Sequence, residues 1–162
     1  MMTDPVPPPT PPTGAEIVNV MLTATPWTRA LGILLLGVTP ARARLMAPYR
    51  ADLIGDAETG VIAGGVISAL LDQGCGAAVM AAMQQHQSIA TLDLRIDYMR
   101  GAIPGRDIIA EAHCYKLTRS VAFVRAVAFE DSPDDPVANA TAAFMIASDG
   151  GRRAGANYKA PR

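Results

Sequence analysis

The sequence predicts an α+β domain in which a curved antiparallel sheet wraps around one long central helix. Three observations support this: apolar residues at helical spacing over about residues 63–85, a hairpin pattern before them, and four strand patterns after them. Short turns between successive strands make those strands antiparallel neighbours. The single long helix must then bury its apolar surface against one face of the sheet.

Length and composition narrow the function classes. The chain has 162 residues, 50% of them apolar, and a formal net charge of −1, which suits a compact fold. It does not suit a basic nucleic-acid binder or a disordered chain. We therefore expect no nucleic-acid partner. We expect no membrane span, because no uncharged apolar stretch reaches ~20 residues. We expect a cytoplasmic location, because the first residues lack a signal-peptide pattern.

The cysteine pattern predicts no metal site. Cys75 and Cys114 have neither CxxC spacing nor histidines at zinc-like intervals. We therefore expect two reduced thiols in the core. His86 and His113 have no triad-like or metal-like companions either, and we assign them no chemistry.

The domain is predicted to span residues 14–149, between a disordered Pro-rich tail at 1–13 and a loose tail at 150–162. Turn signals and apolar patterns then divide the first part of the domain. They predict a short helix at 15–23, a helical turn at 27–31, a hairpin of 33–38 with 43–46, and a loop at 48–60.

The central helix is apolar on nearly every side, which is typical of a buried helix. Gly74 and Gly76 inside it each cost up to ~1 kcal/mol relative to alanine, so we expect another backbone to come close there. One carboxylate, Asp72, interrupts the apolar run. A charge there costs free energy unless it has a partner or a chemical role. Asp72 could be a functional group or could form a structural hydrogen bond to a neighbouring strand, and we favour the functional role.

The segment ATLDLRIDYM alternates with the period of a strand. Its apolar side chains are predicted on one face and its charged ones on the other: Leu92, Leu94, Ile96 and Tyr98 against Asp93, Arg95 and Asp97. Three more strands are predicted in DIIAEAHCYKL, SVAFVRAVAFED and PVANATAAFMIAS.

Three segments share a family pattern: GVIAGGVISALLDQGCGAAV, TLDLRIDYMRGA and KLTRSVAFVRAVAFED. Together they resemble the hotdog-fold acyl-CoA thioesterases, most closely the phenylacetic-acid-degradation type. That family has a His-Gly-Gly helix start and an Asp nine residues after the His, which corresponds here to Asp72. This sequence has Ala63 in place of the His, and Ala57 where relatives often carry an Asn.

The resemblance implies a thioester-hydrolysing site. The Gly64 amide, at a helix N-terminus, would polarise the substrate carbonyl, with Ala63 and Gly65 beside it in contact with substrate. The structural alternative is that the two glycines only allow tight packing. Asp72 would act as general base or nucleophile. The Thr91 hydroxyl would hold the water, with Ser88 as a weaker alternative.

Gly64 and Asp72 of one chain are too far apart to act on the same carbonyl. Eight residues of helix span about 12 Å, which an aspartate side chain cannot bridge. If both act, two antiparallel helices must meet across a two-fold axis in a homodimer. The resemblance implies the same arrangement, with sheets paired edge to edge, acyl-CoA bound between subunits, and dimers that commonly pair into tetramers.

A CoA ester also needs cations for its phosphates, and Arg100, Lys116 and Arg119 are the candidates. The loop around Leu53 and Ile54 would help line the acyl pocket. No cofactor is expected beyond the CoA of the substrate. Two alternatives remain: a non-catalytic acyl-CoA-binding hotdog module, because Ala63 and Ala57 lack polar groups, and a hotdog hydratase or dehydratase.

Overall fold

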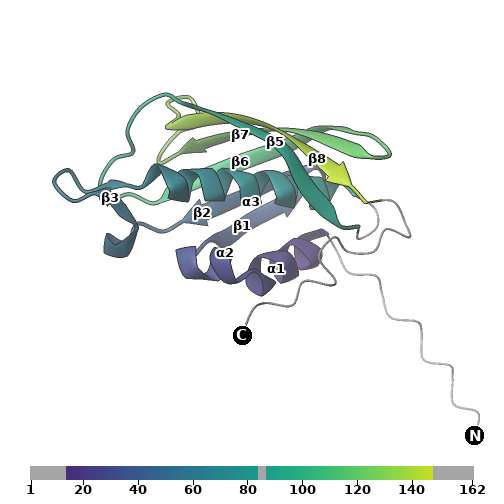
Figure 1. Ribbon diagram of the computed structural model, residues 1–162, viewed down its shortest axis with the longest axis horizontal. Helices are drawn as coiled ribbons and strands as arrows, with labels where there is room; N and C mark the ends of the chain where they lie inside the picture. The colour runs from purple at the N-terminus through teal and green to yellow at the C-terminus, as the bar shows by residue number, and fades with distance from the viewer. Residues whose placement is uncertain (1–13, 84–86, 148–162) are drawn as a thin grey trace, which may run out of the picture.

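A six-stranded antiparallel sheet curls around α3 (Gly64–Ala82) in the computed structural model, which describes residues 14–83 and 87–147 (Figure 1). The strand order is β1-β2-β6-β7-β8-β5, and β3 and β4 form a separate hairpin. This confirms the predicted α+β architecture. The remaining elements are α1 (Gly14–Ala24), α2 (Pro26–Leu31), β1 (Leu34–Thr39), β2 (Arg42–Ala47), η1 (Ala51–Leu53), β3 (Ile54–Asp56), β4 (Val61–Ile62), β5 (Ile89–Tyr98), β6 (Ile108–Leu117), β7 (Val121–Phe129) and β8 (Ala138–Ile146).

The segment predicted as a plain loop at 48–60 is partly ordered, so that prediction was wrong. It contains η1 and β3, and β3 pairs with β4 through a tight turn. The Asp56 carboxylate accepts hydrogen bonds from the Glu58 amide and the Thr59 hydroxyl, while Gly60 takes a left-handed φ of 73°. Local side-chain bonds of this kind let a polar, glycine-containing stretch form a turn between two short strands.

The long helix ends earlier than predicted. α3 ends at Ala82, and Met83 is already extended, so the helix is shorter than the predicted 63–85. Residues 84–86, which include His86, lie outside the described residues. So do residues 1–13 and 148–162, and the tails predicted at 1–13 and 150–162 stay predictions.

Small side chains on the inner face of the sheet allow α3 to lie close to it. The inward-facing, buried positions of its strands are rich in alanine: Ala43, Ala47, Ala110, Ala112, Ala122, Ala126, Ala128, Ala138, Ala140 and Ala142. A β-carbon added at Gly74 would lie 3.7 Å from that of Ala110, and one at Gly76 would meet Ile89 and Phe144. The close approach at these glycines is therefore to the chain's own sheet.

The rest of the core agrees with the sequence prediction. Cys75 and Cys114 are both free and buried, as predicted. By length and composition alone α3 could cross a membrane, but 61% of its apolar window is buried within the fold. It is packed as the core helix of a globular domain.

The two sides of α3 differ. On the side of β1, helix α1 packs against both α3 and β1 (Figure 1). On the side of β5, α3 keeps incompletely buried residues, which we call the open stripe: Gly64, Gly65, Ser68, Ala69, Asp72 and Gln73. β5 is also an edge strand of the sheet, with ten residues. The open stripe and this edge lie side by side.

Candidate active site between α3 and β5

A β-bulge brings the Thr91 hydroxyl to Asp72. Strict alternation would put Thr91 on the outer face with Asp93, but the register shifts between these two residues. Thr91 therefore lies opposite the buried Phe144, on the inner face, and its Oγ1 donates a hydrogen bond of 3.0 Å to Asp72 Oδ1. A bulge can flip which face a side chain occupies.

Because of the same bulge, the predicted inward orientation of Leu92 is wrong. This side chain was expected to face inward, yet it is 57% exposed on the edge strand. Leu94 and Ile96 pack against the core as predicted. Ser88, the alternative to Thr91, is exposed, and its backbone carbonyl binds the Ala147 amide.

Asp72 is half-buried on the open stripe rather than enclosed. Within residues 14–83 and 87–147, Thr91 is the one side chain that hydrogen-bonds its carboxylate. A purely structural carboxylate would make the same bond to a neighbouring strand. The contact therefore positions Asp72 and leaves one carboxylate oxygen for another partner.

Cys75, one turn further along the helix, is not a competing nucleophile. Burial, together with the nearby Asp72 charge, raises the pKa of its thiol to about 12. The thiol is therefore protonated at neutral pH, and only a thiolate is a good nucleophile. Asp72, rather than Cys75, is therefore the candidate reactive group at this point of the helix.

The N-terminus of α3 presents free backbone donors. The N-cap residue is Ala63, which is extended and has no side-chain acceptor for the first amides. Its own N–H donates to the Leu53 carbonyl and its carbonyl accepts from the Val66 amide, both at 2.9 Å. In the described part of the chain the Gly64 and Gly65 amides have no acceptor, and both residues are exposed. Such amides, at the positive end of a helix dipole, can bind a carbonyl oxygen or an anion.

Sequence reasoning missed two residues at this helix start. The Tyr98 hydroxyl donates to the Gly64 carbonyl at 2.7 Å and lies 2.9 Å from Ser68 Oγ, which is itself 3.1 Å from the same carbonyl. Ser68 could have been found, because it follows Gly64 by four residues and shares its helix face. Tyr98 could have been found as the last inward-facing residue of its strand.

Gly64 and Asp72 do not converge in one chain. They belong to the same continuous helix, so about 12 Å of helix axis separates them. Leu53 and Ile54, the predicted acyl-pocket residues, are half-buried beside the start of α3, where the Leu53 carbonyl binds the Ala63 amide. The structure thus places the loop and the amides at one end of the open stripe and Asp72 with Thr91 further along it.

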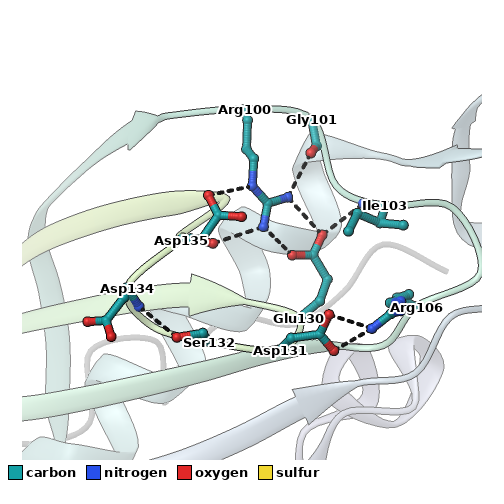
Figure 2. A network of polar contacts seen from close by, with 9 residues as sticks. All are labelled: Arg100, Gly101, Ile103, Arg106, Glu130, Asp131, Ser132, Asp134 and Asp135. Carbon is teal, nitrogen blue, oxygen red and sulfur yellow. Dashed lines mark hydrogen bonds and ion pairs between the residues drawn. The ribbon is translucent and has the colours of Figure 1, made fainter.

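Arg100 is occupied by a structural network, which contradicts its expected role as a free phosphate ligand (Figure 2). Its guanidinium donates to both oxygens of Glu130, to the Asp135 carboxylate and backbone carbonyl, and to the Gly101 carbonyl. An arginine has five N–H donors, and these bonds use all five. Two carboxylates also surround one cation, so the local charge disfavours a phosphate.

Lys116 and Arg119 lie at the other end of the sheet from Arg100. Tyr98, just before Arg100, pairs with Ala138 at the start of β8, whereas Val121, just after Arg119, pairs with Met145 near its end. Lys116 and Arg119 are exposed around the β6–β7 turn. One chain therefore does not bring the three predicted phosphate ligands to one place.

Glu130 is the most deeply buried carboxylate of the Arg100 network, with 1% of its side chain exposed. Burial alone raises the pKa of this carboxyl, but the hydrogen bonds from Arg100 and from the Ile103 amide outweigh it, so the pKa is lowered. A lowered pKa means that folding favours the ionised form. The network thereby ties the segment after β5 to the β7–β8 turn (Figure 2).

We expect Glu130→Gln to lower the free energy of unfolding by about 2–3 kcal/mol at pH 7, because it leaves Arg100 without its main anion. The loss should shrink below about pH 4, since the carboxylate's contribution is present above its unfolded pKa of about 4.3 and disappears as it protonates. Denaturant unfolding at pH 7 and pH 3.5 measures both values. Asp131→Asn, which breaks the exposed pair with Arg106, is the matched control and should cost less than about 1 kcal/mol.

The outer face of the sheet carries a separate polar surface. An open hollow of about 250 Å³ is lined there by Arg42, His113 and Arg125 among others. These three residues pair directly across β2, β6 and β7. The sheet separates this hollow from Asp72, so it is not part of the candidate site.

Comparisons with known proteins agree with this fold. The sequence model of the thioesterase superfamily matches residues 59–137, a segment that contains α3, β5, β6 and β7. A solved structure of a Pseudomonas aeruginosa protein is 36% identical, with 82% of this chain and 98% of that chain covered and a TM-score of 0.76. A search of the curated proteins found no match.

Two further solved structures bear the name of phenylacetic acid degradation proteins. A variant of PaaI from Thermus thermophilus is 27% identical, with 75% of this chain and 98% of that chain covered and a TM-score of 0.65. The E. coli PaaI protein is 15% identical, with 83% and 94% covered and a TM-score of 0.74, which shows a shared fold. The fold and the family match define a class: the chain belongs to the thioesterase superfamily, with a hotdog fold similar to that of the two PaaI proteins.

Proposed function

We propose that the protein hydrolyses an acyl-CoA thioester at a site shared by two copies of the chain. Gly64 of one subunit would bind the thioester carbonyl, and Asp72 of the partner subunit would attack it or activate a water. The supporting observation is that the two groups needed for this reaction, an oxyanion donor and a carboxylate, lie apart on one helix. Unoccupied amides lie at its start, and a carboxylate held by Thr91 lies about 12 Å further along.

A two-fold axis near Ser68 would join these halves. Ser68 lies four residues from Gly64 and four from Asp72. In an antiparallel helix pair centred there, each Gly64 lies beside Asp72 of the partner subunit, and two equivalent sites form. Among the described residues no strand pairs with the outer edge of β5. This free edge and the exposed Leu92 favour an interface on this side, since long free edges invite pairing with another chain.

The proposed chemistry follows from the groups available. The helix-start amides stabilise the negative charge that develops on the carbonyl oxygen. Asp72 either takes a proton from a water that attacks the carbonyl carbon, or attacks that carbon itself to give an anhydride that water then opens. Both routes break the carbon–sulfur bond and release CoA as a thiol and the acyl group as a carboxylic acid.

The phosphates of CoA are assigned to Lys116 and Arg119. Both are exposed at the end of the sheet that lies beyond the C-terminal half of α3. In an antiparallel dimer this end of one subunit lies near the helix start of the other. Arg100 is not included, because all its donors are already bonded.

The first test is release of free thiol from short, medium, long and aromatic acyl-CoAs, including phenylacetyl-CoA because of the names of two relatives. We expect turnover of at least one ester and a dimer or tetramer by light scattering. Tight binding of CoA esters without turnover would instead support the non-catalytic module, for which the apolar Ala63 at the helix start is the argument. A stable monomer that still turns over substrate would contradict the shared site.

A further inference from the structure

We infer that Tyr98 is a positioning residue for the oxyanion-binding amides and that Ser68 assists it. This inference rests on the proposed function and assigns the helix start a support that the proposal does not include. Its basis is the pair of hydroxyls that meet on one backbone oxygen, the carbonyl of Gly64.

The hydrogen-bond directions can be assigned from the number of protons. The Tyr98 hydroxyl has one proton, which it donates to the Gly64 carbonyl at 2.7 Å. Ser68 also has one proton, which it donates to the Tyr98 oxygen at 2.9 Å or to the same carbonyl at 3.1 Å. Either choice gives the carbonyl more than the single bond that a helix normally supplies. When Ser68 donates to Tyr98, and Tyr98 donates to the Gly64 carbonyl, each hydrogen bond strengthens the next.

This carbonyl shares a peptide group with the Gly65 amide. The peptide is planar, so its carbonyl oxygen and its N–H point in opposite directions. A clamp on the Gly64 carbonyl therefore fixes the direction of the Gly65 N–H, and polarisation of the carbonyl makes that N–H a stronger donor. Two successive glycines are the most flexible way to begin a helix, so an external clamp has the most effect here.

The backbone that carries Tyr98 is well fixed, while the side chain itself is 50% exposed. Tyr98 ends β5, where its backbone pairs with Ala138, and the next amide, Met99, donates to the Val137 carbonyl at 2.8 Å. Two residues after it, Arg100 is held by Glu130 and Asp135 (Figure 2). The network that removes Arg100 from phosphate binding thus anchors the strand end that carries the clamp.

The Tyr98 ring also limits what can stand at position 64. A β-carbon added to Gly64 would lie 3.4 Å from the Tyr98 oxygen and 3.7 Å from the ring carbon that bears it. A larger side chain would push against the ring. A residue no larger than alanine at this position therefore lets the tyrosine hydroxyl reach the backbone.

Tyr98→Phe tests the inference, because it removes the hydroxyl and keeps the ring. We expect kcat for the best acyl-CoA to fall about five- to tenfold, the effect of one well-placed hydrogen bond, while KM changes less than twofold. The ¹⁵N resonance of the Gly65 amide should move in the same variant. Ser68→Ala should lower kcat less, and the double variant should lose little more than Tyr98→Phe, because both hydroxyls act on one oxygen.

Tyr49→Phe is the matched control. The Tyr49 hydroxyl also donates to a glycine carbonyl at 2.7 Å, that of Gly60 in the β3–β4 hairpin. Both variants should lower the melting temperature by similar amounts, but only Tyr98→Phe should lower kcat. An unchanged kcat and Gly65 resonance in Tyr98→Phe would overturn the inference while leaving the hydrolase proposal intact. Absence of turnover in the unmodified protein would contradict the proposed function, and the Gly65 resonance would still report on the clamp.

Discussion

Asp72→Asn is expected to lower kcat/KM for acyl-CoA hydrolysis by about 10²–10⁴-fold, the usual contribution of a general base. The amide nearly keeps the volume of the carboxyl group and can still accept the hydrogen bond from Thr91. It can neither take a proton from water nor attack a carbonyl. Because Asp72 is half-buried, its replacement should change stability little. Thiol release across a range of substrate concentrations measures kcat/KM, and thermal unfolding checks that the variant is folded.

Asp93→Asn is the matched control for this variant. Asp93 is an exposed carboxylate on the same strand as Thr91, but the bulge leaves it on the outer face. Its replacement should change kcat/KM less than twofold. If Asp72→Asn turns over substrate as fast as the unmodified protein, Asp72 has no chemical role and its bond to Thr91 is structural.

Gly64→Pro is expected to lower kcat by about 10²–10³-fold, as loss of one oxyanion donor does. Proline lacks the N–H but suits the first position of a helix. The preceding Ala63 already has the extended conformation that proline requires, with φ −62° and ψ 133°. Gly64→Ala keeps the N–H and adds only a β-carbon in ordinary contact with Tyr98, so it should lose much less activity.

Mixing the two defective variants tests whether the site is shared. A dimer of one Asp72→Asn subunit and one Gly64→Pro subunit has one site with both defects and one site with neither. Random pairing makes half of all dimers mixed, so co-expression should restore about a quarter of the normal number of sites. If both residues acted within one chain, no combination would restore activity, and the two-fold arrangement would be refuted.

Much of this protein is determined by local sequence. The apolar run from Val66 to Met80 predicts a buried helix because its side chains are apolar on nearly every side of the helix axis. The strands after it follow from alternation and turn residues, and Asp72 stands out because a lone charge in such a helix needs a reason. The two glycines before this run mark the helix start and its free amides. These features come from periodicity and composition within a few residues, which is what a sequence displays directly.

Tertiary structure decided which of these groups meet. Thr91 faces Asp72 only because a bulge shifts the register of β5 on β8, and perfect alternation in the sequence points the other way. Arg100 is occupied because folding brings Glu130 and Asp135, thirty or more residues away, around its guanidinium. Tyr98 reaches Gly64 across a separation of 34 residues. Pairings of this kind depend on strand register and on contacts distant in sequence, and no local pattern encodes either one.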